Sequence, residues 1–426
     1  MRMTELAKWL MVMALGIATI WVYHPRYKHS SMEVRGFETF ALAQSLVEHR
    51  GFSDPFQTLA TGPSAHFPPL YPAYLALVMM AFGNGALGSN IIIWTVLLLL
   101  ALQLMMLPIL ARYLGLGFWT GVLAALAWIA AGIPPNFFWE SNLATVLVIG
   151  IVFCMHGSLS RPLSTRHILI SSTLWGALLL LQPVVVAVFP FWLLLLHFRS
   201  QTSRLQKIAL GLLPMVFVLP WIARNFVVFH QPVFIRDNLG LELAVSNNPC
   251  ASPLFEDNDQ SGCFELTHPN ENYEEALKVQ QLGEVEYNRG RLREGVNWIT
   301  ANPGAFAILS AQRFGAFWLP PRSENKSNGI IWRPFVVHLF SLLSIPALFF
   351  MWRNARSGAY VMLLWLVFFP PIYYFIQFMD RYRYPIFWAT FLSGSYFITE
   401  VVRGLAGSRQ GQGEVRDLDP LAPGEA

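Results

Sequence analysis

Long apolar runs constrain this chain more than any other feature of its sequence. Hydrophobic residues make up 54% of its 426 residues and charged residues only 13%, a composition that no soluble domain of this length needs. A helix of about 20 apolar residues spans a hydrocarbon core of roughly 30 Å. The sequence therefore predicts an all-α polytopic membrane protein. Runs near the required length cover residues 6–22, 90–110, 117–131, 141–157, 210–222, 335–351, 359–378 and 385–401.

A ninth run, residues 167–198, is too long for one span. The dipeptide Gln182-Pro183 lies near its middle and predicts two short helices, because proline removes a main-chain donor. With both counted, we expect ten crossings. Residues 1–24 share some features of a signal peptide, but residues 21–25 offer no small-residue cleavage site. We therefore interpret the first run as a retained anchor.

Basic residues predict the orientation of these helices. They occupy the short loops between apolar runs, and those loops hold no acid, so the positive-inside rule places them in the cytoplasm together with both termini. The first external loop is then residues 23–88. If the proline-led helix expected at 70–82 crossed the membrane, the later basic loops would all lie outside. We therefore expect that helix to lie in the interface or to be re-entrant. The basic residues are Arg112, Arg161, Arg166, Arg199, Arg204, Lys207, Arg353 and Arg356.

The same reasoning divides the chain into four parts. Residues 1–222 form a transmembrane core with the first external loop, and residues 223–333 form a small external cap with helical spacing at 272–300 and 303–318. Residues 334–403 hold the last transmembrane helices. Residues 404–426 are polar and rich in glycine, so we expect a disordered cytoplasmic tail. Cys250 and Cys263 share the external cap, where they either pair as a disulfide or remain two free thiols.

The polar residues with chemical potential gather on the external face. Glu38 belongs to a helix-like stretch that places it at head-group depth, where desolvation raises a carboxyl pKa above its usual value. Arginines such as Arg224 and Arg381 stand at helix ends, where the guanidinium fork suits a phosphate. No zinc spacing, P-loop, dinucleotide fingerprint or nucleophile elbow is present. One base and an arginine-lined groove fit transfer from a lipid phosphate, because a phosphate leaves without a general acid.

Each of these residues also has a plain structural interpretation. Glu38 fits an ordinary solvated position on an interfacial helix, and Arg224 and Arg381 fit cations that reach toward head groups. Glu140 fits the first turn of the helix that follows it, where an acid complements the helix dipole. His66 fits a turn donor beside two prolines.

Four stretches resemble the bacterial GT-C membrane glycosyltransferases of the glycosyltransferase family 39 type, which includes protein O-mannosyltransferases and aminoarabinose transferases. The first stretch carries an acid on a juxtamembrane helix before a Gly-Phe turn, and the second is a Pro-Pro-Leu entry to a helix. The third leads out of the core, and the fourth is the turn before a late helix. They cover residues 37–56, 62–72, 220–225 with 236–243 and 247, and 381–385.

The resemblance implies a GT-C fold of about ten transmembrane helices with juxtamembrane helices in the first external loop. It implies a multi-pass protein of the inner (plasma) membrane that acts on the extracytoplasmic face. The donor is a polyprenyl-phosphate sugar, such as an undecaprenyl-phosphate sugar, and the acceptor is a glycan, lipid or protein; no nucleic acid is involved. Transfer is inverting. Because Phe37 precedes Glu38 where relatives show an acid pair, we expect no metal or other cofactor.

Residue roles follow by position from the same resemblance. Glu38 matches the catalytic base, and Glu140 matches a second acid. The remaining roles are lipid-phosphate binding for Arg224, Arg236, Arg381 and Arg383, and the sugar or acceptor pocket for His66, Tyr71, Asn225 and Asn247.

Three other functions compete with this hypothesis. A transporter or flippase for a lipid-linked solute predicts ionisable residues within the spans or broken helices in repeated halves, and the runs here are nearly free of charge with no evident repeat. An O-antigen ligase or polymerase is a neighbouring enzyme class, distinguished by whether the first external loop carries the essential acid. A non-catalytic scaffold subunit predicts that substitution of Glu38 is silent.

Overall fold

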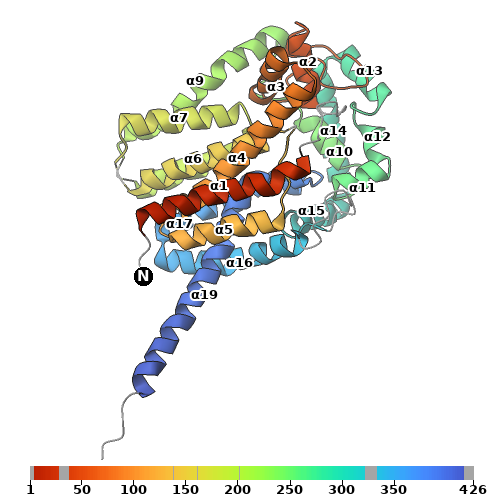
Figure 1. Ribbon diagram of the computed structural model, residues 1–426. Coiled ribbons are helices and arrows are strands. Elements are labelled where there is room, and N and C mark those ends of the chain that lie inside the picture. Colours follow the sequence, from red (N-terminus) through yellow and green to blue (C-terminus); the bar gives the residue numbers. More distant parts are fainter. Residues whose placement is uncertain are drawn as a thin grey trace, which may run out of the picture.

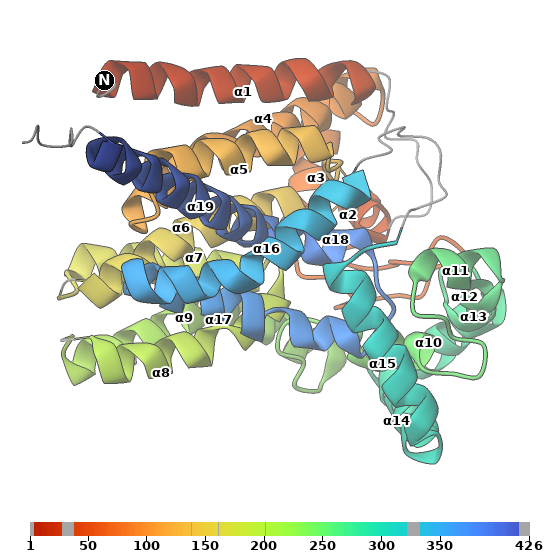
Figure 2. The ribbon, with the colours of Figure 1, turned by 90° about the horizontal axis from the view of Figure 1, so that it is seen from below.

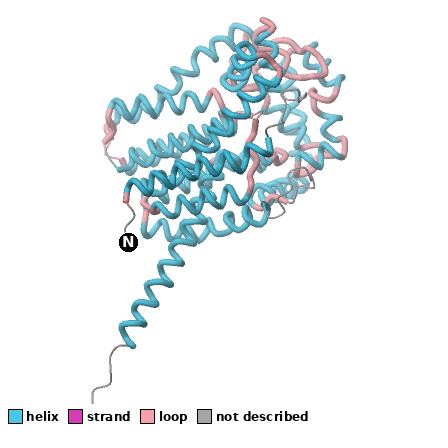
Figure 3. Tube along the Cα trace, viewed as in Figure 1, coloured by secondary structure: helices cyan, strands magenta, loops and turns pink. Residues whose placement is uncertain are grey.

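Helices form nearly all of the regular structure in the computed structural model of the chain. The model describes residues 4–27, 38–137, 139–160, 162–200, 202–321 and 333–416, with side chains described up to residue 405. Within these ranges no strand occurs, and the loops gather mainly at one end of the molecule (Figure 3). The predicted all-α class is confirmed.

A bundle of long helices forms the body of the protein, and a cap of short helices covers one end (Figure 1). Figures 1 and 2 place the N-terminal end of α1 and the far end of α19 on the side away from the cap. The bundle consists of α1 (Glu5–Tyr27), α4 (Ala86–Tyr113), α5 (Phe118–Ala131), α6 (Ser141–Ser160), α7 (Thr165–Leu179), α8 (Phe189–Arg199), α9 (Arg204–Phe229), α16 (Arg333–Asn354), α17 (Arg356–Phe368) and α19 (Phe387–Arg416).

Six helical segments in the described ranges are long and apolar enough to cross a membrane: α1, α4, α6, α9, α16 and the segment Arg356–Tyr374 that begins with α17. Three shorter apolar helices are Leu70–Phe82, Phe118–Ala131 and Pro183–Arg199. Each predicted run corresponds to a helix of the bundle. The ten predicted crossings and their orientation remain predictions.

Prolines interrupt two of the long apolar runs, and only the first of these two breaks was predicted. The run 167–198 is divided as predicted: α7 ends at Leu179, and the 3-10 helix η1 (Pro183–Ala187) leads into α8. The run 359–378 was predicted to be continuous, but α17 ends at Phe368. Pro370 and Pro371 follow, and because consecutive prolines lack main-chain donors the chain continues as the 3-10 helix η3 (Pro370–Tyr374).

Two helices extend beyond the boundaries predicted from the sequence. Helix α9 continues to Phe229, so the cap does not begin at 223 and Arg224 lies within the helix. Helix α19 continues to Arg416, so residues 404–416 are helical where disorder was expected. Residues 417–426 lie outside the described residues.

The first external loop supplies two short helices. Helix α2 (Glu38–Val47) packs against α3 (Leu70–Phe82), and α3 begins directly after Pro69, as the Pro-Pro-Leu sequence predicted. The predicted part of the first helix before Glu38 lies outside the described residues. Helix α2 ends before the expected Gly51, because His49 already adopts a left-handed conformation with a φ of 60°.

The cap comprises α10 (Leu239–Ser246), α11 (Phe255–Gln260), α12 (Cys263–Thr267), α13 (Tyr273–Leu282), α14 (Glu284–Ala301) and α15 (Pro303–Trp318). Its closest helix contact joins α10 to α14 at Gly240. A Cβ at Gly240 would overlap the main-chain oxygen of Asn288, while the Asn288 side chain accepts from the main-chain N–H of Leu241 at 3.2 Å. Only glycine permits this approach of two backbones.

A buried arginine ties the cap to the bundle. Arg313 of α15 is fully buried and donates to the main-chain oxygens of Ser246 and Phe375 and to the Oδ1 atom of Asn247. Phe375 follows η3, so this one side chain joins α10, α15 and the end of a bundle helix. Hydrogen bonds to a charged donor are stronger than neutral ones.

Because the backbones of α10 and α14 meet at Gly240, replacing Gly240 with alanine should push the two helices apart. We expect G240A to lower the unfolding free energy by about 1–3 kcal/mol, the usual cost of overpacking, and to reduce the thermal midpoint of the protein in detergent.

G290A is the matched control, because a Cβ at Gly290 of α14 meets nothing within 4 Å. Alanine there should leave stability unchanged or raise it by up to about 1 kcal/mol, since glycine weakens helices. Equal midpoints for both variants would contradict the proposed backbone contact.

Candidate active site

Glu38 stands at the first position of α2, at the end of the bundle that the cap covers. Its side chain is partly buried. Burial raises the pKa of Glu38 to about 7, and the main-chain N–H of its own helix and the charge of Arg381 offset part of that rise. A carboxyl group with this pKa can exchange its proton near neutral pH, as a general base must.

Two arginines share the surroundings of Glu38. Arg381 of α18 (Asp380–Arg383) stacks on the Trp139 ring with its guanidinium carbon 3.5 Å from the ring centre. Arg236 lies over the ring of Phe67 at 4.9 Å and donates its Nε–H to the main-chain oxygen of His66 at 3.2 Å. Aromatic stacking holds both planar cations in place and leaves other donors available.

Both arginines line a cavity of about 290 Å³, here called the apolar cavity. Glu140 also lines it, and burial raises the pKa of Glu140 while the charge of Arg381 opposes that rise. Thus two carboxyl groups, Glu140 and Glu242, and two cations face a wall that is otherwise largely apolar. The other lining residues are Phe67, Ser141, Gln182, Pro183, Val184, Val186, Ala187, Asn238, Leu239, Ile372, Tyr373, Ile376 and Tyr382.

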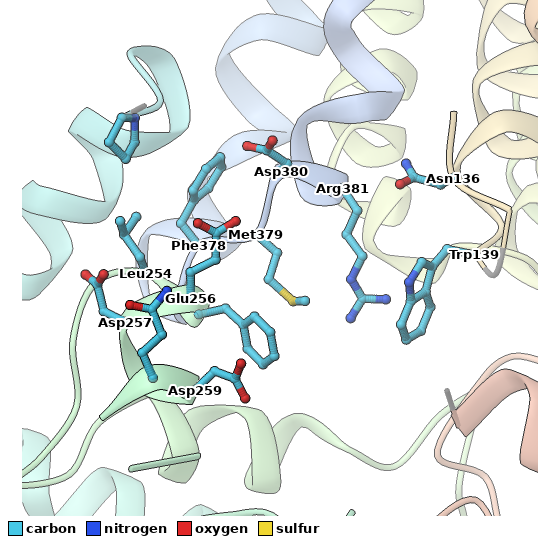
Figure 4. A pocket seen from close by; sticks show the side chains of 13 residues that line it. Asn136, Trp139, Leu254, Glu256, Asp257, Asp259, Phe378, Met379, Asp380 and Arg381 are labelled. Carbon is cyan, nitrogen blue, oxygen red and sulfur yellow. The ribbon is translucent and has the colours of Figure 1, made fainter. Parts of the chain in front are cut away.

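A second cavity of about 640 Å³, here called the acidic cavity, lies on the other side of Arg381. Figure 4 shows Arg381 beside Trp139, and the carboxylates of Glu256, Asp257 and Asp259 among the other side chains that line the cavity. Arg381 therefore lines both cavities, and Trp139, on which it stacks, lines the acidic cavity. The remaining lining residues are Asn136, Leu254, Phe255, Gln260, Pro321, Phe378, Met379 and Asp380.

Two histidines converge on Glu38. Glu38, His66 and His268 each offer one nitrogen or oxygen atom, and the three atoms lie within 4.8 Å of one another. Carboxylate and imidazole are ligands that Zn²⁺ accepts, so these are the side chains that could hold a metal ion. His66 and His268 are buried, and burial lowers the pKa of both, to about 3 for His268, so both rings are neutral.

Two predicted site residues, Arg224 and Asn225, have hydrogen-bond partners within the fold. Arg224 donates to the main-chain oxygens of Ser64 and Phe52, each at 2.8 Å, and clamps the first external loop onto α9. Its neighbour Asn225 is fully buried and donates to the main-chain oxygen of Val233. Neither Arg224 nor Asn225 lines the apolar cavity.

Arg383, Asn247 and Tyr71 are likewise used within the fold. Arg383 is fully buried and donates to the main-chain oxygens of Phe317 and Trp318 at 2.8 Å. Asn247 accepts from Arg313, and the Tyr71 hydroxyl donates to the main-chain oxygen of Phe137 at 2.6 Å. The structure thus brings Glu38, Glu140, His66, Arg236 and Arg381 together.

Sequence reasoning missed His268, Glu242 and Trp139. Trp139 directly precedes Glu140, and Glu242 lies in the stretch 236–243, so both are adjacent to residues that the sequence analysis selected. His268 lies in the cap, more than 200 positions from Glu38, and no sequence spacing links His268 to Glu38. The disulfide that was one of two alternatives is present: Cys250 and Cys263 are bonded, with Cα atoms 5.8 Å apart. It closes the segment between α10 and α12.

The chain matches no protein-family model and no curated protein. Among solved structures it is similar to the archaeal oligosaccharyltransferase AglB from Archaeoglobus fulgidus in complex with an inhibitory peptide and a dolichol-phosphate. That TM-score is 0.53, at 12% identity, covering 97% of this chain and 52% of that one. The Archaeoglobus fulgidus oligosaccharyltransferase in the apo form gives a TM-score of 0.54 at 13% identity, covering 98% and 53%. Its complex with Zn and sulfate gives 0.53 at 13% identity, covering 93% and 49%.

These similarities define the fold. The protein is a helical membrane protein with the GT-C fold of the oligosaccharyltransferases, as the resemblance implied. The chain spans about half the length of the oligosaccharyltransferase chains that it matches.

The two neighbouring arginines Arg381 and Arg383 should behave oppositely when each is replaced with methionine. R383M leaves buried carbonyl oxygens without donors, at about 1–3 kcal/mol each, so we expect a thermal midpoint several degrees lower. R381M removes a cation from a cavity wall and should leave the midpoint near that of the wild type. Thermal unfolding of the purified proteins in detergent measures both, and a larger loss in R381M would contradict this assignment.

Proposed function

We propose that the protein is an integral-membrane glycosyltransferase. It moves a hexosyl or pentosyl group from a polyprenyl-phosphate donor to an acceptor hydroxyl on the capped, extracytoplasmic face, with inversion. The observation that carries this proposal is the position of Glu38, a carboxyl group with a pKa of about 7, among two arginines that line a largely apolar cavity. A base, a phosphate site and an apolar wall are the three things that such a transfer needs.

The apolar cavity suits the donor. Its rim includes Val186, Leu239 and Ile372, apolar side chains that are 47%, 55% and 37% exposed, as expected where a lipid chain passes from the bilayer. Each buried CH₂ of such a chain contributes about 0.8 kcal/mol. Arg236 and Arg381 would hold the phosphate through charge-assisted hydrogen bonds.

The proposed chemistry is one displacement. Glu38 takes the proton of the acceptor hydroxyl while that oxygen attacks the anomeric carbon. The bond from the anomeric carbon to the phosphate oxygen breaks, and its electron pair leaves with the polyprenyl phosphate. Arg381 and Arg236 stabilise the charge that develops on the phosphate. Because the oxygen attacks opposite to the leaving group, the configuration at the anomeric carbon is inverted.

The solved oligosaccharyltransferase complex holds a dolichol-phosphate and a peptide, which supports a polyprenyl-phosphate donor and a separate acceptor here. Whether the acceptor is a glycan, a lipid or a protein decides the biological role. The acidic cavity offers it a route, because Arg381 borders both cavities. Its carboxylates would favour neutral or cationic acceptors over anionic ones.

We also propose that the transfer needs no metal ion. The Nδ1 atom of His268 accepts a hydrogen bond from the main-chain N–H of Asn270 at 3.1 Å. In a neutral imidazole the proton then resides on Nε2, which makes that atom a donor and removes it as a metal ligand. One of the three groups around Glu38 is therefore unsuited to coordination.

E38Q should abolish transfer, with a loss of about 10²- to 10⁴-fold or more, because glutamine cannot accept the proton. The assay supplies purified protein with a panel of undecaprenyl-phosphate sugars and follows the release of undecaprenyl phosphate. E48Q is the matched control, since Glu48 is exposed just beyond the same helix and pairs with Arg50.

The pH profile checks the same assignment. Glu38 acts as a carboxylate and its pKa is about 7, so kcat/KM should fall about tenfold per pH unit below pH 7 and level off above it. Wild-type activity in E38Q would overturn the proposal in this form, and an enzyme with its essential acid elsewhere would replace it. A wild-type protein that consumes no donor would instead favour a transporter or a scaffold subunit.

Chelation tests the absence of a metal. Protein treated with EDTA and transferred to metal-free buffer should keep its full rate of donor consumption. Loss of activity that Zn²⁺ or Mn²⁺ restores would instead show that Glu38, His66 and His268 hold a cation.

A further inference from the structure

His268 is a neutral side chain that the cap brings close to Glu38. It lies between α12 and α13, is only 6% exposed, and stacks on Phe264 with ring centres 4.5 Å apart. Because its Nδ1 atom accepts from Asn270 and its ring is neutral, its Nε2 atom carries a proton. The stack and the hydrogen bond together fix the direction in which that proton points.

The loop of Glu38 holds this part of the cap in position. Thr58 donates its hydroxyl to the main-chain oxygen of Pro269 at 2.6 Å, and the main-chain N–H of Gln57 donates to the Asn270 side chain at 3.2 Å. Phe56 packs edge-on against both His66 and His268, with ring centres 5.1 and 5.9 Å away. The two residues that follow His268 are thus tied to the first external loop.

The spacing of the three side chains fits one oxygen atom. For three points within 4.8 Å of one another, some position lies no farther than 4.8/√3, about 2.8 Å, from all of them. That is the length of a hydrogen bond to oxygen. Among the described residues, no hydrogen bond joins Glu38, His66 and His268 to one another, so a hydroxyl group can be held without breaking a contact within this set.

We propose that His268 binds the acceptor hydroxyl, donating its Nε2–H to the oxygen whose proton Glu38 removes. The inference rests on the proposed function and names a residue of the acceptor site within it. All four tetrahedral positions of the hydroxyl oxygen are then occupied. One holds its bond to carbon and one the proton shared with Glu38. One lone pair accepts the hydrogen bond from His268, and the other attacks the anomeric carbon. His66 forms the third side and orients the oxygen by contact.

The assignment gives the cap a direct part in the reaction. The acceptor site is complete only when the segment that carries His268 is docked on the first external loop. Phe255, which lines the acidic cavity, packs edge-on against Phe264 at 5.0 Å, and Phe264 stacks on His268. Two aromatic rings therefore lie between the acidic cavity and His268.

Two substitutions separate hydrogen bonding from packing. H268F keeps a ring against Phe264 and removes the donor, whereas H268Q replaces the ring with an amide that can donate from nearly the same place. H197F is the control, because His197 is an exposed histidine at the end of α8. Thermal midpoints show which variants are folded.

The first readout needs no substrate. The infrared carbonyl band of protonated Glu38, identified by its loss in E38Q, gives the midpoint of Glu38 titration in each variant. The charged groups around Glu38 are Arg381, Arg236 and Glu242, and none of them changes. An N–H dipole within 4.8 Å of a carboxylate favours its charged form even without a direct hydrogen bond. H268F should therefore raise the midpoint by about half a pH unit or more, and H268Q should return it toward the wild type. An unchanged midpoint in H268F, or an equal shift in H268Q, would overturn the proposal.

The second readout separates this inference from the proposed function. Binding of undecaprenyl phosphate should be unchanged in H268F, while donor consumption falls about 10- to 100-fold and partly recovers in H268Q. If E38Q is inactive but H268F consumes donor at the wild-type rate, the role of His268 is wrong and the enzyme proposal stands. If E38Q is active, the proposed function itself fails.

Discussion

Buried arginines bonded to main-chain oxygens hold this structure together at the junction between cap and bundle. Arg313 joins two cap helices to the end of η3, Arg224 clamps the first external loop to α9, and Arg383 joins α15 to the last helices. A guanidinium removed from water is costly unless its donors are used, and here each of the three bonds to two main-chain carbonyl groups. The placement of Glu38, His66 and Arg236 depends on these three anchors.

The anchors create the environment that makes Glu38 a candidate base. A carboxylate in water titrates far below neutrality, and one deeply buried without a cation would stay protonated. Glu38 lies between these limits, because burial raises its pKa and Arg381 restrains the rise. The same cation faces a cavity that suits a lipid phosphate. In the proposed reaction, this one side chain would balance the charge of Glu38 and stabilise the leaving phosphate.

Much of the fold could be predicted from the sequence, because the bilayer demands long apolar runs and prolines interrupt helices wherever they fall. The break at Pro183 and the start of α3 after Pro69 are examples, and the missed break at Pro370 follows the same rule. Glu38 was identifiable because an acid at the edge of a membrane helix is unusual. The roles of Arg381 and Arg383 could not be separated, since two residues of one short turn point to different surroundings. The sequence around His268 does not mark it as a site residue, because it approaches Glu38 only through a contact between distant segments of the chain.

The shared position of Arg381 has a thermodynamic consequence. Its guanidinium borders both the apolar and the acidic cavity and stacks on Trp139 of the acidic cavity. A ligand that shifts this cation on one side must alter affinity on the other, and linkage makes the effect reciprocal. The apolar and acidic cavities are therefore coupled through Arg381. Occupancy of one cavity then changes the affinity of the other, even when the two bound molecules never touch.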